Sequence, residues 1–202
     1  MHDGSVPHDA SARIDAGVVV PIRAFTAAKA RLSPRLDAAE RGALAQRLAE
    51  TVVRAALPLA VVIISSAHEV RSWAAARSLP CIDDPGSLDG AAAAGRDWVH
   101  AAGLSRVVVA HADLPFARSL AEVAGGGTGP EARLVPCHRG DGTPVLAVPV
   151  AAPFDFRYGP GSFARHVDEA HRCELAVRVV RDPDLRFDVD FPEDLDQMAL
   201  RR

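Results

Sequence analysis

Short apolar runs alternate with longer amphipathic stretches through the first half of the chain. The run at 17–22, GVVVPI, is apolar and bounded by turn residues, as expected of a strand buried on both faces. The stretch at 38–57 has apolar residues at helical spacing, with Leu44, Leu48 and Val52 on one stripe. The same alternation predicts strands at 60–65, 80–82 and 106–110, and helices at 68–78 and 87–98. Such repetition predicts a largely parallel sheet with helices on both faces.

The pattern changes in the second half of the chain. Two apolar runs, 134–137 and 144–150, are separated by a glycine-containing turn at 138–143, which predicts a hairpin and therefore a mixed sheet. Further elements are predicted as a helix at 162–175, a strand at 176–180 and a last helix that opens at 190–193. We therefore expect one α/β domain, residues 17–202, after a disordered N-terminal tail, residues 1–16.

Composition and charge limit the kinds of molecule that the protein is expected to bind. Hydrophobic residues make up 49% of the 202 residues and charged residues 24%, as in soluble globular proteins. The net charge of −3 provides no general basic field, so we expect no nucleic-acid partner. The first 16 residues lack the apolar segment of a secretory signal, and no apolar run approaches the roughly 20 residues of a membrane span. We expect a cytoplasmic protein without a membrane partner.

Three cations follow the first predicted strand. In open α/β sheets, ligands bind beyond the carboxyl ends of the strands. Arg23, Arg31 and Lys29, which is the only lysine in the chain, lie there within nine residues. Guanidinium and ammonium groups bind the charges of a triphosphate, although the same spacing also fits a solvated basic loop. The segment lacks both GxxxxGK[ST] and GxGxxG, so it predicts neither a P-loop nor a dinucleotide-binding oxidoreductase.

Three aspartates are candidate metal ligands. Asp113 follows the apolar strand at 106–110, where a carboxylate can reach a hard cation, unless it only caps a turn. Asp188 and Asp190 point to one side of an extended segment. Asp190, with Pro192 and Glu193 after it, also fits the pattern of a helix capping box. Asp188 is therefore the better metal candidate, with Asp190 shared between capping and the site.

A polar, glycine-rich pair of segments forms a candidate anion site. The first, 139–143, reads RGDGT, and the second, 157–166, reads RYGPGSFARH. Exposed backbone amides near Gly159, and Ser162 at a predicted helix start, would favour an anion. Two glycines that flank a proline also form an ordinary turn, and the residues alone leave both interpretations open.

Five motifs in one order resemble a known family. The segments VPIRAFTAAKARL, HADLP, GDGT, FRYGPGSFARH and DVDFPEDL are similar to those of the guanylyltransferases of deazaflavin-coenzyme biosynthesis, which include phosphoenolpyruvate and 2-phospho-L-lactate guanylyltransferases. The resemblance extends from about Val18 to Leu195. It implies a single-domain, Rossmann-like nucleotidyltransferase fold.

The resemblance also implies roles for site residues. The acid would be held by Thr143, Gly159 and Ser162; magnesium would be bound by Asp113, Asp188 and Asp190; and the triphosphate would be bound by Arg23, Lys29 and Arg31. Lys29, Asp113 and Asp188 are the implied catalytic residues. The chain departs from the family where GDGT precedes Pro144, and where Leu88-Asp89 replaces a common Leu-Asn pair.

The implied reaction is transfer of GMP from GTP to phosphoenolpyruvate, or to a related acid such as 2-phospho-L-lactate or 3-phospho-D-glycerate, with release of pyrophosphate. Two alternatives remain open: a nucleotidyltransferase for a sugar phosphate or the molybdenum cofactor, and a non-catalytic nucleotide-binding protein. The first would ordinarily have a glycine-rich loop after the first strand, and 23–30 contains no glycine. The sequence also leaves open the choice of acid, GTP against ATP, and assembly as a homodimer.

Overall fold

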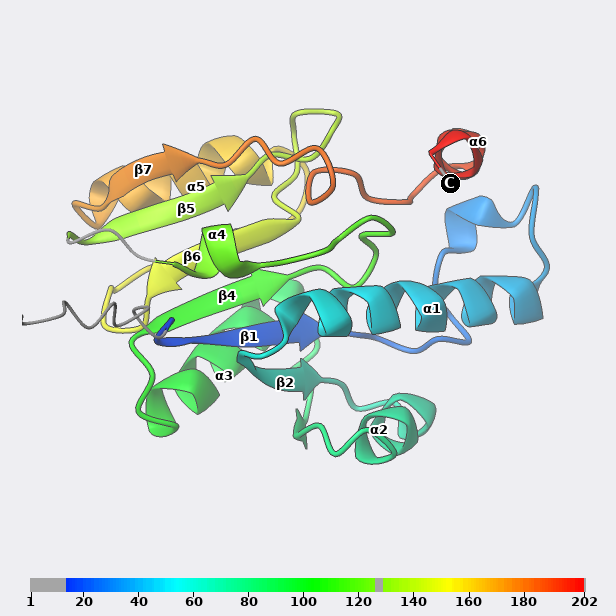
Figure 1. Ribbon diagram of the computed structural model, residues 1–202, viewed down its shortest axis with the longest axis horizontal. Coiled ribbons are helices and arrows are strands. Elements are labelled where there is room, and N and C mark those ends of the chain that lie inside the picture. The colour runs from blue at the N-terminus through cyan, green and yellow to red at the C-terminus, as the bar shows by residue number, and fades with distance from the viewer. Residues whose placement is uncertain (1–13, 126–128, 202) are drawn as a thin grey trace, which may run out of the picture.

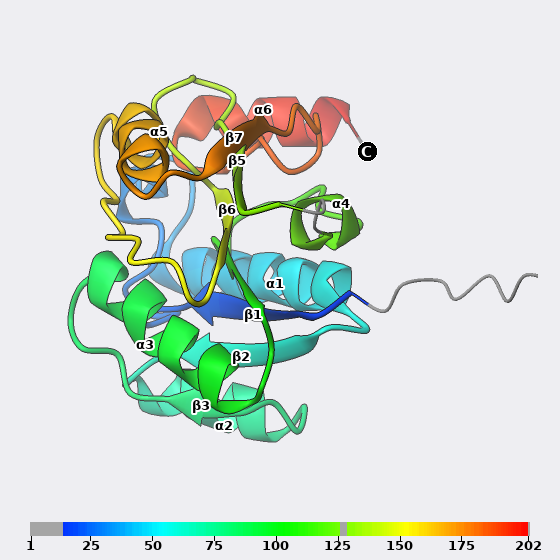
Figure 2. The ribbon, with the colours of Figure 1, turned by 90° about the vertical axis from the view of Figure 1, so that its left-hand side faces the viewer.

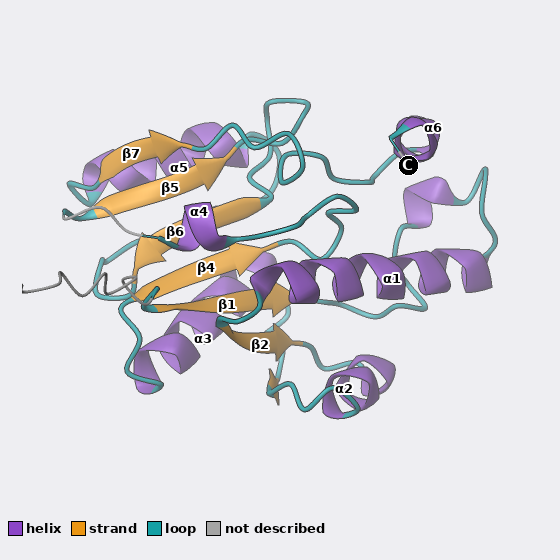
Figure 3. Ribbon diagram, viewed as in Figure 1, coloured by secondary structure: helices purple, strands orange, loops and turns teal. Residues whose placement is uncertain are grey.

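The computed structural model describes residues 14–125 and 129–201, which form one sheet with helices packed on it (Figures 1 and 3). The strands are β1 (Ala16–Pro21), β2 (Ala60–Ile64), β3 (Cys81–Ile82), β4 (Arg106–Ala110), β5 (Glu131–Val135), β6 (Val145–Pro149) and β7 (Ala176–Val179). The helices are the 3-10 helix η1 (Ala30–Leu32), α1 (Ala38–Ala56), α2 (His68–Ala75), α3 (Leu88–Ala101), α4 (Ala121–Ala124), α5 (Ser162–Arg172) and α6 (Pro192–Leu200).

The predicted tail overlaps the described residues only at its end. Residues 1–13 lie outside them, Ile14 packs against the core, and Ala16 begins β1, one residue before the predicted start of the first strand.

Strand order confirms the prediction of a mixed, mostly parallel sheet. The order is β3-β2-β1-β4-β6-β5-β7, and β6 runs antiparallel to both β4 and β5, whereas the other neighbouring pairs are parallel. β5 begins at Glu131 rather than at Leu134, so the predicted start of this strand is wrong. The strand begins with charged residues, which the pattern of apolar residues did not include. Arg133 is buried, and its guanidinium donates to the Glu131 carboxylate, with 2.7 Å between Arg133 Nε and Glu131 Oε1.

Helices cover both faces of the sheet, as predicted (Figure 2). Val18 and Val20 of β1 belong to the core beneath α1, α2 and α4, whereas Val19 belongs to the core on the opposite face, with residues of α3 and α5. This alternation follows from the period of two in a β-strand. No helix in the described ranges is long and apolar enough to cross a membrane.

Register brings several chain segments to one edge of the sheet. Val19 of β1 pairs with Val109 of β4, so the segments that follow these parallel strands leave the sheet side by side. Ala110, at the end of β4, pairs with Val145, which begins the antiparallel strand β6. The His111 amide also donates to the Pro144 carbonyl at 2.8 Å. The motif after β4 therefore lies directly beside the turn between β5 and β6.

Candidate active site

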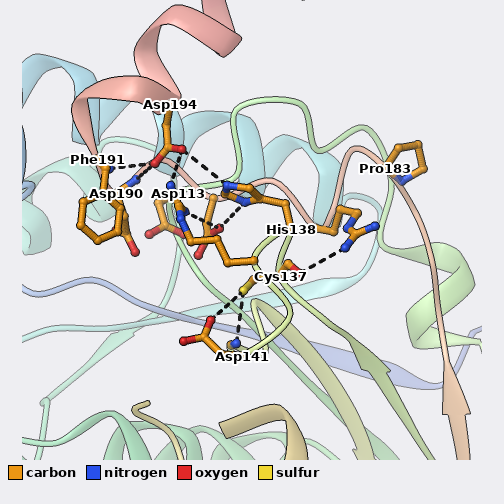
Figure 4. Close-up of polar contacts among 12 residues, drawn as sticks. Asp113, Cys137, His138, Asp141, Pro183, Asp190, Phe191 and Asp194 are labelled. Carbon is orange, nitrogen blue, oxygen red and sulfur yellow. Dashed lines mark hydrogen bonds and ion pairs between the residues drawn. The ribbon is translucent and has the colours of Figure 1, made fainter. Parts of the chain in front are cut away.

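Lys29, Asp113 and Asp190 form a charged cluster at this edge, and Figure 4 shows the two aspartates. The Lys29 ammonium lies 2.7 Å from Asp113 Oδ2 and 3.2 Å from Asp190 Oδ1. The segment with Asp190 is held beside Asp113 by a backbone hydrogen bond, in which the Val189 amide donates to the Asp113 carbonyl at 3.2 Å. Three segments distant in sequence therefore bring opposite charges together.

The charges in this cluster support one another's ionised forms. Burial alone would lower the pKa of Lys29, but the carboxylates of Asp113 and Asp190 outweigh it and raise the pKa above its ordinary value. Burial would likewise raise the pKa of Asp113, yet the Lys29 ammonium holds that pKa below its usual range. Lys29 also has a φ of 54°, in the left-handed region that a residue with a Cβ adopts at some cost in strain.

Asp188 lies in the least favourable electrostatic surroundings of the three aspartates. Burial raises its pKa, and the neighbouring negative charges of Asp113 and Asp190 raise it further. Its Oδ1 lies 3.0 Å from His138 Nδ1. A divalent cation between these carboxylates would relieve their mutual repulsion.

The donor set fits a magnesium ion that is bound together with substrate. Asp113 Oδ1 is buried and has no hydrogen-bond partner among the described residues, so one carboxylate oxygen is free for a ligand. Within the same residues, no group of three or more His, Cys, Asp or Glu side chains is arranged to hold a metal by itself. Magnesium commonly uses one or two carboxylates, water and substrate phosphates rather than an all-protein cage. Asp113 and Asp188 are suited to such a shared site.

The predicted capping box at Asp190 is wrong. Helix α6 begins at Pro192, and Asp194 Oδ2 accepts the amide protons of Asp190 at 2.8 Å and of Phe191 at 2.7 Å. The Asp190 side chain faces Lys29 instead. Asp190 therefore belongs to the charged cluster rather than to the helix cap.

Asp194 is a site-building residue that sequence reasoning missed. Its side chain is fully buried, and its Oδ1 lies 2.6 Å from Arg139 Nη2 and 3.5 Å from His138 Nε2. It thus ties the Asp188–Asp190 segment to the β5–β6 turn. The available signal was an acidic residue in the first turn of a helix, which the adjacent Glu193 also provides.

Thr143 and Ser162 lie together, as the prediction of an acid site requires. Their hydroxyl oxygens are 3.4 Å apart, and both residues are buried. Helix α5 begins at Ser162 and is joined to the β5–β6 turn because the Phe163 amide donates to the Asp141 carbonyl at 3.1 Å. Gly159 has a φ of 103°, which favours glycine, and lines the same hollow.

Two hollows meet at this edge of the sheet. One, of about 620 Å³, is lined by Arg23, Lys29 and Asp113 among others. The other, of about 480 Å³, holds the Thr143 group and Asp188. Both hollows are bordered by Arg31, Leu88, His111 and Asp190. Two ligands could therefore bind side by side, with the aspartates close to the boundary between them.

The three cationic residues that were predicted to bind the triphosphate differ in position and exposure. Only Lys29 points into the charged cluster, while Arg23 and Arg31 are exposed at the rim of the larger hollow. Arg31 Cζ lies 5.1 Å from the centre of the Phe191 ring.

Asp89, where this chain departs from the Leu-Asn pair common in the family, supports the smaller hollow. Asp89 Oδ1 accepts the Tyr158 amide at 2.6 Å and so holds the segment that carries Gly159.

Comparison with known proteins decides the family. A family model described as Guanylyl transferase CofC like matches residues 16–201. The chain belongs to this family. The predicted resemblance to these guanylyltransferases is thus confirmed, and so is the prediction that the chain is an enzyme of the nucleotidyltransferase class. The motifs that carried the resemblance all lie within the matched range.

Relatives and solved structures agree with this membership. The phosphoenolpyruvate guanylyltransferase of Sphaerobacter thermophilus is 33% identical, over 90% of this chain and 91% of that protein. The 2-phospho-L-lactate guanylyltransferase of Methanothermobacter thermautotrophicus is 29% identical, over 90% of this chain and 83% of that protein. A nucleotidyl transferase structure from the latter organism has a TM-score of 0.61 at 14% identity, covering 93% of this chain and 99% of that one. That structural likeness confirms the nucleotidyltransferase fold.

Proposed function

We propose that this guanylyl transferase family member transfers GMP from GTP to phosphoenolpyruvate and releases pyrophosphate, as a step of deazaflavin-coenzyme biosynthesis. The observation that carries the proposal is the pair of hollows that meet beside Asp113, Asp188 and Asp190. One hollow is lined by cations suited to a triphosphate, and the other by hydroxyls and a helix start suited to a small anion. The name of the Sphaerobacter relative supports phosphoenolpyruvate as the acid.

The reaction needs positioning and charge neutralisation more than proton transfer. The phosphate of the acid is ionised near neutral pH, so its oxygen can attack the α-phosphorus of GTP without a general base. A new phosphoanhydride bond forms, and the bond to the β-phosphate breaks as pyrophosphate leaves. This chemistry explains why the cluster contains carboxylates and a lysine rather than an activated serine or cysteine.

Lys29 and a magnesium ion held by the aspartates would share the neutralisation of the negative charge of the phosphates. The Lys29 ammonium, held by Asp113 and Asp190, can turn toward the negative charge of the triphosphate and of the leaving pyrophosphate. Asp113 and Asp188 would hold magnesium, with Asp190 beside them. Bound magnesium would supply Lewis-acid stabilisation of the phosphoryl oxygens.

A second acid, 2-phospho-L-lactate, is kept as an alternative because a relative that carries this activity in its name covers the same part of the chain. A sugar phosphate is less well supported. The solved structures that resemble this chain share its fold at low identity, and the segment at 23–30 lacks the glycines expected for that class.

The experiment is a matrix of acids and nucleotides, read by pyrophosphate release with and without magnesium. We expect release with GTP and phosphoenolpyruvate in the presence of magnesium, and loss of release in Asp113→Asn, which should remain folded and unfold cooperatively. Glu174→Gln, at an exposed position outside both hollows, is the matched control and should retain the wild-type rate. Release with no phosphorylated acid, or an Asp113→Asn enzyme with the wild-type rate, would contradict the proposal.

A further inference from the structure

His166 lies behind the hydroxyl pair of the smaller hollow. It belongs to α5, one turn after Ser162, and its side chain is fully buried. Its Nε2 lies 3.0 Å from the Arg157 amide, and its Nδ1 lies 3.1 Å from Thr143 Oγ1. The ring therefore connects two walls of the hollow: Thr143, in the β5–β6 turn, and the segment that leads to Gly159.

The hydrogen bonds assign the proton of this ring. A backbone amide can only donate, so His166 Nε2 must present its lone pair to Arg157. In the neutral ring, the proton is then on Nδ1, which donates to Thr143 Oγ1. Burial, helped by the nearby Arg165 charge, lowers the pKa of His166 to about 4, so the neutral form prevails near pH 7.

This assignment fixes the direction of the Thr143 hydroxyl. Because the oxygen of Thr143 accepts from the ring, its own proton must point elsewhere. The remaining directions lead to Ser162 Oγ, at 3.4 Å, or into the hollow. A hydroxyl whose oxygen already accepts a hydrogen bond is also a stronger donor, since hydrogen bonds in a chain polarise one another.

We propose that His166 is a positioning residue that makes the Thr143 hydroxyl an outward donor to the anionic group of the acid. The proposal rests on the proposed function, because it takes the smaller hollow as the acid site. His166 neither touches the acid nor exchanges a proton with it. The same ring also anchors Arg157, and its edge-on contact with Tyr158, 4.7 Å between ring centres, supports the loop that contains Gly159.

The first test needs no substrate. Nitrogen-15 spectra of the imidazole in the free enzyme near pH 7 report which ring nitrogen carries the proton. We expect the form protonated on Nδ1. A His166 protonated on Nε2, or on both nitrogens, would overturn the proposal whatever the enzyme's substrate is.

The second test separates the two hydrogen bonds of the ring. H166N keeps a nitrogen close to the position of Nδ1, while H166Q keeps an acceptor close to the position of Nε2. We expect H166Q to raise the KM for phosphoenolpyruvate about 10-fold, more than H166N does, because loss of an oriented donor to a charged group costs roughly this factor. The KM for GTP should change little in either variant. His171→Gln, on the exposed face of the same helix, is the control and should change neither KM.

Coupling to Thr143 distinguishes positioning from general support of the fold. If His166 acts through the hydroxyl, H166Q should add little to the KM increase caused by T143V, whereas independent effects would multiply. Multiplying effects, or equal increases for both substrates that follow a lowered melting temperature, would overturn the proposal. Direct binding of phosphoenolpyruvate, measured by calorimetry, gives the same comparison without turnover. Failure of the proposed function would give a different result: the wild-type enzyme would release no pyrophosphate with any acid.

Discussion

The stability of the fold should fall as the pH is lowered from 8 to 5, and His166 should account for part of that fall. The pKa of the buried ring is lowered to about 4, whereas an exposed histidine in the unfolded chain titrates near 6.5. The unfolded state therefore binds a proton first on acidification. The stability associated with the neutral ring is complete above about pH 6.5 and is lost as the pH falls toward 4.

The size of this effect follows from the two pKa values. At pH 5 the unfolded ring is almost fully protonated, and the folded ring is protonated in about a tenth of the molecules. The difference corresponds to about 2 kcal/mol of unfolding free energy lost between pH 8 and pH 5. Glu169 contributes little in this interval, because hydrogen bonds from Arg172 hold its pKa at about 2, so its stabilisation is lost mainly as the pH falls from about 4.5 toward 2.

The assay is denaturant unfolding at pH 8 and pH 5 for wild type, H166Q and the exposed-site control His171→Gln. What matters is the change with pH in each protein, because H166Q lowers stability at both values. We expect H166Q to lose about 2 kcal/mol less on acidification than wild type and the control do. Equal losses in all three proteins would refute the assignment of His166 as a buried, neutral ring.

Two further changes test the residues that shape the site and the sheet. Asp194→Asn should lower the unfolding free energy by about 1–3 kcal/mol, because it weakens a buried acceptor of the Asp190 and Phe191 amides; an unchanged denaturation midpoint would contradict this. Gly95→Ala should lower it by about 1–3 kcal/mol, because the new Cβ would overlap Val19 Cγ1 and force α3 away from β1; thermal melting should detect this, and wild-type melting would argue against close contact.

The pattern of apolar and polar residues predicted those strands that are continuous apolar runs in the sequence. β1, β2 and β4 are short, apolar and bounded by turn residues, so the run of side chains was sufficient to find them. The first residues of β5 could not be found in this way. Arg133 is buried there only because Glu131 and the Glu122 carbonyl, which comes from α4, satisfy its guanidinium. That partnership depends on tertiary structure, which a pattern of apolar residues does not contain.

Asp190 illustrates how a local rule fails at a site. A proline and an acidic residue shortly after Asp190 are good signals for a helix cap, because the hydrogen bonds of a cap form between residues that are close in sequence. In the structure, the Asp194 carboxylate accepts the amide proton of Asp190. The Asp190 carboxylate is then free to pair with Lys29, 161 positions away. The negative charge of Asp190 helps to keep the buried Lys29 ammonium ionised. The competing partner was invisible to the local pattern.

The proposed acid site was suggested by resemblance, and the structure shows how its two hydroxyl groups come together. Thr143 and Ser162 are 19 positions apart, and only the docking of α5 on the β5–β6 turn brings their hydroxyls to 3.4 Å. His166 then fixes the direction of one hydroxyl from within the core, while the rim cations of the other hollow remain exposed. Selection among small acids should therefore reside in buried, fixed donors, and a change in that selection should require changes behind the hollow as well as in it.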